Sequence, residues 1–133
     1  MTRSLQKKDA RKGTAVAVEA ETPDTVAVPR EDGKLAEIVR RLVDAYDPDR
    51  VYLFGSTARG DAGPDSDYDL MVVVPDDAPR ERRRAGLAYE VLWEAGRAAD
   101  VVVQTRQYFT SRLHLKASLP ATVEREGRLL YAK

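Results

Sequence analysis

Hydrophobic residues recur along the chain at spacings that predict an alternation of helices and strands. The first helical pattern lies between residues 35 and 43, where the apolar positions follow the three-and-four spacing of one buried face. These positions are Leu35, Ile38, Val39, Leu42 and Val43. Asp32 is a candidate N-cap for this helix. The helix should end at Asp47-Pro48, because a residue that precedes proline is disfavoured in helical backbone.

Four shorter apolar runs have the length and composition of strands. They are Val51–Phe54, Tyr68–Val74, Ala99–Gln104 and Leu129–Tyr131. The connection between the first two runs is rich in Gly and Asp and has no clear helical pattern. We therefore expect these two strands to form an antiparallel, hairpin-like pair rather than a parallel pair joined by a crossover helix.

Two further segments have helical character. A helix is predicted over roughly Pro79 to Ala95, and its buried stripe comprises Leu87, Ala88, Val91, Leu92 and Ala95. Residues 106–117 are compatible with either a helix or a loop. Pro120 can open a short helix that Gly127 closes. The resulting order predicts a small mixed α/β (α+β) domain, in which helices pack against one sheet.

The first thirty residues differ from the rest. Residues 1–30 are predicted to form a flexible N-terminal tail, and residues 31–133 the folded domain. Val16 and Val18 alternate with alanine, so a short edge strand is an alternative for that part of the tail. The basic residues at the start of the tail could touch nucleic acid, although a solvated terminus is the simpler interpretation.

Composition narrows the class of protein. A chain of 133 residues with 43% hydrophobic residues suits one domain with one ordinary core. The absence of Cys excludes a disulfide scaffold and a thiolate zinc site. No apolar run or leader pattern predicts a membrane span or secretion, so we expect a cytoplasmic protein. With 22 basic and 22 acidic residues, nucleic acid is not expected as a direct ligand.

Three carboxylates indicate a metal site. Asp67 and Asp69 are two residues apart at the start of a predicted strand, so their side chains emerge on the same face. Carboxylates that converge in this way repel each other unless they share a cation, and Mg²⁺ prefers such oxygen ligands. Asp100 opens another predicted strand. If the two strands are neighbours, three carboxylates could hold two metal ions.

A candidate phosphate-binding loop lies just upstream. Gly55-Ser56 follows the strand that ends at Phe54, and exposed backbone N–H groups in such a turn can bind phosphate oxygens. The Arg59 guanidinium can donate several hydrogen bonds to a triphosphate. Phosphoryl or nucleotidyl transfer is the reaction class that needs both a metal site and a phosphate site.

These residues resemble a known family. Gly55-Ser56, followed after ten residues by Asp67-Tyr68-Asp69, resembles the signature of the polymerase-beta-type nucleotidyltransferase superfamily. The strings from Phe54 to Gly60 and from Ser66 to Leu70 are similar to its minimal nucleotidyltransferase (MNT) branch, which includes antitoxins. The ending from Arg125 to Tyr131 is also similar to that of many minimal domains. The resemblance covers about residues 33–131.

The resemblance implies a nucleotidyltransferase fold and a set of roles. Asp67 and Asp69 would bind two Mg²⁺ ions together with ATP, and Asp100 would ligate the catalytic metal and help to deprotonate an acceptor hydroxyl. The residues implied to hold the nucleotide are Gly55, Ser56, Arg59 and Ser66. The acceptor hydroxyl would attack the α-phosphorus, and pyrophosphate would leave.

The same resemblance suggests a partner. Many minimal domains of this family are antitoxins of a HEPN-domain ribonuclease, and some attach AMP to a tyrosine of that toxin. Two alternatives stay open: nucleotidylation of a small molecule, as in aminoglycoside-modifying relatives, and a non-catalytic antitoxin that acts by contact. A homo-oligomer or a hetero-oligomer is compatible with each of these readings.

Several other side chains have a structural and a functional interpretation. The charged run Arg80–Arg84 is expected at the start of the predicted long helix, either as a solvated face or as a dock for an acidic surface or phosphate. Tyr89 and Trp93 are expected to pack against the sheet or to line a partner contact. His114 is expected to be a surface or packing residue rather than a general base. Asp61 and Asp65 are assigned to solvated turns.

Overall fold

The computed structural model describes residues 33–55, 58, 68–96 and 99–133. The predicted N-terminal tail, residues 1–30, and its alternative edge strand therefore lie outside the described residues. So do several residues of the loop between the first two strands, namely Ser56, Arg59, Asp61, Asp65, Ser66 and Asp67.

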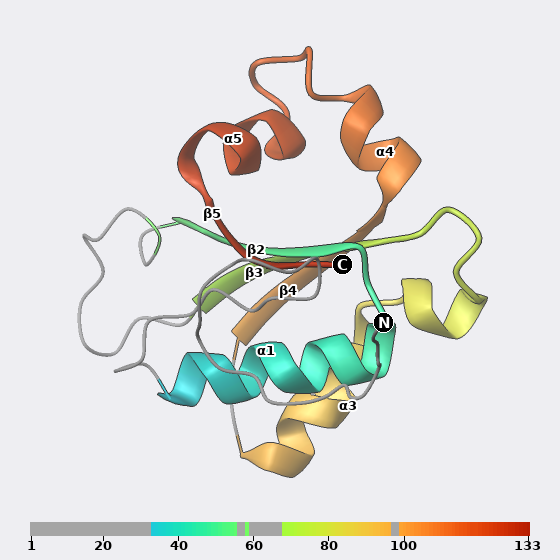
Figure 1. The fold of residues 1–133 in the computed structure, drawn as a ribbon, viewed down its shortest axis with the longest axis vertical. Coiled ribbons are helices and arrows are strands. Elements are labelled where there is room, and N and C mark those ends of the chain that lie inside the picture. The colour runs from blue at the N-terminus through green and yellow to red at the C-terminus, as the bar shows by residue number, and fades with distance from the viewer. Residues whose placement is uncertain (1–32, 56–57, 59–67, 97–98) are drawn as a thin grey trace, which may run out of the picture.

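A four-stranded mixed sheet forms the centre of the domain (Figure 1). The strands, in the spatial order β4-β3-β2-β5, are β4 (Ala99–Thr105), β3 (Tyr68–Val74), β2 (Arg50–Phe54) and β5 (Arg128–Ala132). β2 pairs antiparallel with β3 and with β5, whereas β3 and β4 are parallel. The hairpin-like pairing of the first two strands is confirmed, and so is the mixed α/β class.

Helices cover both faces of the sheet (Figure 1). α1 (Gly33–Tyr46) and α3 (Gly86–Ala95) lie on one face, and α4 (Arg106–Ser111) and α5 (Leu119–Glu126) lie on the other. A short 3₁₀ helix, η2 (Arg80–Arg83), precedes α3. None of the helices in the described part of the chain is long and apolar enough to cross a membrane.

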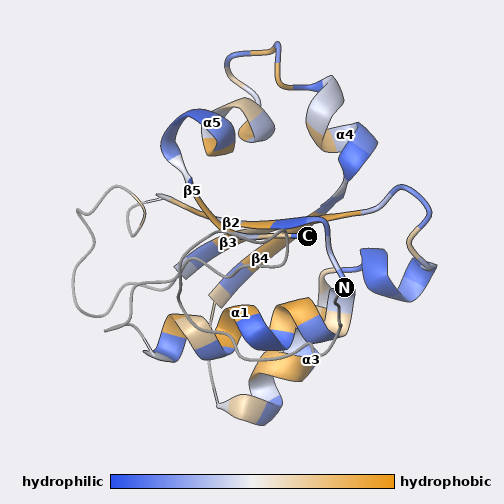
Figure 2. Cartoon of the chain, viewed as in Figure 1, coloured by the Kyte–Doolittle hydropathy of each residue, from blue (hydrophilic) through white to orange (hydrophobic). Residues whose placement is uncertain are grey.

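The alternation of side chains along β3 supplies both hydrophobic layers. Leu70, Val72 and Val74 belong to the core beneath α1 and α3, and Met71 and Val73 belong to the core beneath α4 and α5. All five are at most 3% exposed, which explains why β3 reads as a continuous apolar run. In Figure 2 hydrophobic residues follow the strands and the helices that cover them, whereas η2 is hydrophilic.

The first helix follows the predicted pattern. Leu35, Ile38, Val39 and Leu42 are buried, and Val43 packs against the same core. The helix ends at Tyr46, and Asp47 adopts a left-handed backbone with φ 46° before Pro48. The proline thus ends the helix as predicted, because its ring disfavours helical backbone in the preceding residue.

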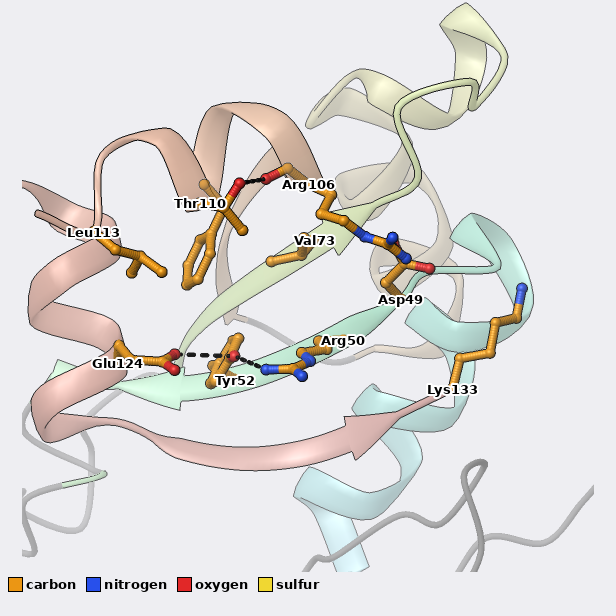
Figure 3. A pocket seen from close by; sticks show the side chains of 10 residues that line it. Asp49, Arg50, Tyr52, Val73, Arg106, Thr110, Leu113, Glu124 and Lys133 are labelled. Atoms are coloured by element: carbon orange, nitrogen blue, oxygen red, sulfur yellow. Dashed lines mark hydrogen bonds and ion pairs between the residues drawn. The ribbon is translucent and has the colours of Figure 1, made fainter.

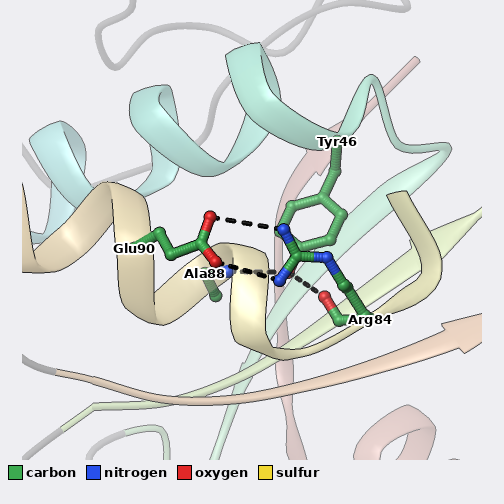
Figure 4. Close-up of polar contacts among 4 residues, drawn as sticks. All are labelled: Tyr46, Arg84, Ala88 and Glu90. Atoms are coloured by element: carbon green, nitrogen blue, oxygen red, sulfur yellow. Dashed lines mark hydrogen bonds and ion pairs between the residues drawn. The ribbon is translucent and has the colours of Figure 1, made fainter. Parts of the chain in front are cut away.

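The predicted helix over residues 79–95 is wrong in one respect, because it is broken in two. Arg84 is extended (φ −102°, ψ 139°), and α3 starts at Gly86. The hydroxyl of Tyr46 lies at the break, where it donates to the Arg84 carbonyl (2.7 Å) and accepts from the Ala88 N–H (2.9 Å; Figure 4). The buried hydroxyl therefore replaces a helical i to i+4 hydrogen bond and stabilises the interruption.

Side-chain caps define the two helices on the other face. The Thr105 hydroxyl accepts from the Tyr108 N–H at the start of α4, so the ambiguous segment 106–117 begins as a short helix and continues as turns. Ser118 caps α5 in the same way, with Pro120 in its first turn as predicted. Gly127 ends α5, and a Cβ on it would lie 2.8 Å from the Leu53 carbonyl oxygen, so only glycine fits this close approach.

The Tyr46→Phe variant tests the hydroxyl bridge. It removes the two hydrogen bonds of the hydroxyl, so the Ala88 N–H keeps only its bond to the Ala85 carbonyl (3.0 Å) and the Arg84 carbonyl keeps only the long bond from the Leu87 N–H (3.4 Å). We therefore expect a loss of about 1–3 kcal/mol in the free energy of unfolding, measured by urea denaturation. The control is Tyr89→Phe, because the exposed Tyr89 hydroxyl has no hydrogen-bond partner among the described residues. Equal stability of the two variants would contradict the bridge.

The same variant has a pH signature. Burial raises the pKa of the Tyr46 hydroxyl above its ordinary value of 10.0. Above about pH 10 the unfolded chain therefore releases a proton that the folded chain retains, and the stability of the native protein falls as the pH rises. We expect this alkaline decline to be shallower in Tyr46→Phe.

Candidate active site

Two predicted metal ligands lie side by side on neighbouring strands. The parallel register of β3 and β4 places Asp69 opposite Asp100. Adjacent strands are about 4.8 Å apart, so the two carboxylates can reach a common cation. The alternation of the strands places both on the face that carries Met71 and Val102, beneath α4 and α5. The sequence analysis expected Asp100 to lie beside the acidic residues of the other strand if the two strands are neighbours. β3 and β4 are neighbours.

Both acids lie where the apolar runs of their strands begin. Asp69 is half-buried and precedes the five buried residues of β3, and Asp100 is exposed. The hydrophobic residues hold the two strands in place, while the carboxylates remain accessible from outside. This is the placement that a metal or substrate site requires.

Gly55 lies against the Asp69 carboxylate. Phe54 is paired with Asp69 in the antiparallel ladder, so Gly55 is the first residue beyond that pair. Its φ is 79°, and a Cβ at this position would collide with a carboxylate oxygen of Asp69 and lie 3.2 Å from its Cγ. A side chain at residue 55 is therefore excluded both by the left-handed backbone and by the neighbouring carboxylate.

The other predicted site residues lie outside the described residues, and their roles remain predictions. They are Ser56, Arg59, Ser66 and Asp67. Within the described ranges there is no group of three His, Cys, Asp or Glu side chains that could hold a metal ion. Asp69 and Asp100 supply two oxygen ligands, and a hard divalent cation such as Mg²⁺ takes only one or two carboxylates besides water and phosphate. The donor set therefore fits Mg²⁺.

The aromatic residues of α3 depart from one of their predicted roles. Trp93 is 86% exposed and Tyr89 is 58% exposed, so neither packs against the sheet. They lie four residues apart on one helix and therefore share a face. Exposed Trp and Tyr of this kind are typical of protein-protein contacts, which is the other role that was predicted for them.

The basic run is also placed differently from the prediction. Arg80 to Arg83 form η2, which is separate from α3, so their charges do not lie at the first turn of the long helix. Arg84 forms a two-bond pair with Glu90 (3.1 and 3.3 Å), which raises the pKa of Arg84 and lowers that of Glu90 (Figure 4). These residues are exposed, as the solvated-face interpretation requires.

His114 is exposed as well.

Sequence reasoning did not identify a pocket of about 410 Å³ at the other end of the sheet, between β2, α4 and α5 (Figure 3). Arg50, Tyr52 and Glu124 line it and form a hydrogen-bonded chain. The only signal in the sequence is the alternation of Arg50 and Tyr52 on one strand, and nothing local connects these residues with Glu124.

A comparison with protein families identifies the family of the chain. A family model described as the nucleotidyltransferase domain matches residues 33–129. The chain belongs to this family. The matched range includes Gly55, Asp69 and Asp100, and it extends over all the described helices and the first two residues of β5. The predicted family resemblance is thereby confirmed.

Solved structures that are similar to this nucleotidyltransferase include a candidate nucleotidyltransferase from Sulfolobus solfataricus, with 22% identity, a TM-score of 0.49 and coverage of 73% of this chain and 76% of the other. A toxin-antitoxin with AMP-PNP has 24% identity, a TM-score of 0.47 and 73% coverage of each chain. A mutant of the toxin-antitoxin MntA-HpeT has 21% identity, a TM-score of 0.46 and coverage of 73% and 72%. No curated protein matches the chain.

The Gly55→Ala variant tests the contact between the glycine and the acid. We expect it to lower the free energy of unfolding by at least about 1–2 kcal/mol, because alanine disfavours the left-handed backbone and its Cβ displaces the Asp69 carboxylate. Chemical denaturation measures the loss. Gly33→Ala is the control, since no atom lies within 4 Å of a Cβ at that position. A Gly55→Ala protein as stable as Gly33→Ala would contradict the predicted conflict.

Proposed function

We propose that this nucleotidyltransferase uses Mg²⁺ to transfer AMP from ATP to an acceptor hydroxyl. The observation that carries the proposal is the register that places Asp69 opposite Asp100 at an accessible edge of the sheet. A surface selected only for stability gains nothing from two carboxylates in adjacent positions, because they repel each other. A bound divalent cation would remove this repulsion.

Each of the site residues has a role in the proposed reaction. Asp67, Asp69 and Asp100 hold the metal, and Gly55, Ser56, Arg59 and Ser66 hold the triphosphate. Bound Mg²⁺ stabilises the negative charge that develops on the phosphoryl oxygens. The Asp100 carboxylate accepts the proton of the acceptor hydroxyl. The acceptor oxygen then forms a bond to the α-phosphorus, the bond from the α-phosphorus to the bridging oxygen breaks, and pyrophosphate leaves with that oxygen.

The acceptor in this proposal is a tyrosine of a HEPN-type toxin, and the chain is the cytoplasmic antitoxin of the pair. The family resemblance supports this assignment, and so does the surface of α3, where Trp93 and Tyr89 offer a large aromatic contact area. Aromatic residues of this kind contribute much of the binding energy at protein interfaces. The same surface would also serve a non-catalytic antitoxin, so the experiment must separate the two.

The catalytic proposal is tested with Asp69→Asn and Asp100→Asn. The full chain is incubated with Mg²⁺, α-labelled ATP and the product of the neighbouring gene as the candidate partner, and the label on that protein is measured. We expect each variant to lose about 100-fold or more of the activity, because each removes a metal-ligating charge that stabilises the transition state. The control is Asp77→Asn, an exposed carboxylate in the turn after β3.

The possible results of this experiment separate the alternatives. Label that appears on the partner with the native chain and disappears in both site variants supports catalysis. Suppression of the toxin by all three variants without any label would contradict catalysis and favour inhibition by contact. Label on an added aminoglycoside, but not on the partner, would favour the small-molecule alternative.

The docking surface has a separate test. We expect Trp93→Ala to weaken binding of the HEPN-type partner at least about tenfold, since truncation of an interface tryptophan commonly costs more than 1 kcal/mol of binding free energy. Calorimetric titration of the partner measures the affinity. Leu115→Ala is the control, because Leu115 is 49% exposed but belongs to the turns after α4. An unchanged affinity in Trp93→Ala would exclude α3 as the contact.

A further inference from the structure

The pocket between β2, α4 and α5 lies apart from the carboxylate pair. Val73 contributes to its floor and is four residues along β3 from Asp69, which corresponds to about 13 Å at the rise of a strand. Both sites occupy the same face of the sheet, toward opposite ends of β3. A volume of about 410 Å³ lies within the range of small-molecule sites. The proposed transfer reaction assigns no role to the residues that line this pocket.

Two cations that line the pocket already have ion-pair partners in the chain. Arg106 Nη2 lies 2.6 Å from Asp49 Oδ2, and Lys133 Nζ lies 2.7 Å from Asp47 Oδ1. These four groups therefore need no ligand to balance their charges. Asp49, Arg106 and Lys133 line the pocket and give it charges of both signs.

Arg50 and Glu124 are different, because neither has an ion-pair partner within 4.0 Å among the described residues. Instead they share the hydroxyl of Tyr52. Arg50 Nη1 donates to that oxygen (2.9 Å), and the hydroxyl donates to Glu124 Oε1 (3.1 Å; Figure 3). One wall of the pocket thus carries a cation and an anion, held apart by a neutral phenol.

The phenol between them is fixed in position. Tyr52 is 4% exposed, and its ring stacks on Phe109 with centroids 5.5 Å apart and an interplanar angle of 12°. Burial also raises the pKa of the Tyr52 hydroxyl, so it stays protonated and continues to donate to Glu124 at neutral pH. The separation of the two charges is therefore a stable feature of the pocket.

Both charged groups have hydrogen-bonding capacity left. The Arg50 guanidinium has five N–H donors and uses one of them on Tyr52, and Glu124 Oε2 accepts no hydrogen bond within the described part of the chain. A purely anionic ligand would face Glu124, and a purely cationic ligand would face Arg50. Only a ligand with both charges matches both groups. Val73, Phe109 and Leu113 add an apolar wall for the rest of such a molecule.

We propose that this pocket binds a small zwitterion, with its carboxylate or phosphate on Arg50 and its ammonium group on Glu124. Amino acids and aminoalkyl phosphates have this chemistry. The proposal is independent of the proposed transfer reaction, since none of its residues lies at the Asp69 and Asp100 pair.

Calorimetric titration of the full chain tests the charge requirement. The probes are L-leucine for a carboxylate zwitterion and phosphoethanolamine for a phosphate zwitterion, and the ammonium-free controls are 4-methylpentanoate and inorganic phosphate. We expect saturable binding of at least one zwitterion with a Kd on the order of 1 mM or lower, and at least tenfold weaker binding of its ammonium-free control. Which probe binds identifies the anion. Binding of the control with equal affinity would overturn the proposal.

Variants locate the site. Arg50→Gln and Glu124→Gln should each weaken binding of the zwitterion at least tenfold, whereas Arg128→Gln and Glu126→Gln should not change it. All four side chains are exposed, so the variants are expected to fold, and circular dichroism checks this. In the native chain, amide chemical shifts should move at residues 49–52 and 106–110 but not at Asp100. Absence of saturable binding by both zwitterions, or unchanged affinity in both site variants, would overturn the proposal.

Discussion

The parallel pairing of β3 with β4 is the interaction on which the candidate active site depends. It brings Asp69 and Asp100, 31 positions apart in the chain, to opposite places in one ladder. A parallel pair needs a crossover connection, which here consists of η2 and α3. Ala88 and Leu92 of α3 are buried in the core beneath the sheet, so the burial of this crossover also holds the register of the acids.

The same pairing explains why the candidate metal ligands lie at the ends of the strands. β3 is apolar on both faces and is covered by helices on both sides, so no charge can be accommodated along most of its length. Asp69 lies where this buried run begins, and the close approach of Gly55 brings the end of β2 against its carboxylate. The site is thus formed where the end of β2 and the first residues of β3 and β4 lie together. Two carboxylates on neighbouring strands are ligands that a divalent cation can share.

The face beneath α4 and α5 carries two different electrostatic environments. At one end the acids are neighbours of like charge, which a cation would stabilise. At the other end cations and anions alternate, and the Tyr52 phenol keeps Arg50 and Glu124 from pairing directly. The distance along β3 and the buried side chains between the two ends allow these environments to coexist on one small sheet.

Local patterns in the sequence were sufficient for most elements and for the type of chemistry. The bounds of β3, the buried face of α1 and the end of that helix before Pro48 all follow from backbone periodicity and local sterics. Only the tertiary structure decided the rest. The register of Asp69 with Asp100, the break that Tyr46 stabilises at Arg84, the exposure of Trp93 and the chain from Arg50 to Glu124 each depend on residues far apart in sequence. Their positions are set by the packing of helices on the sheet, which no local pattern encodes.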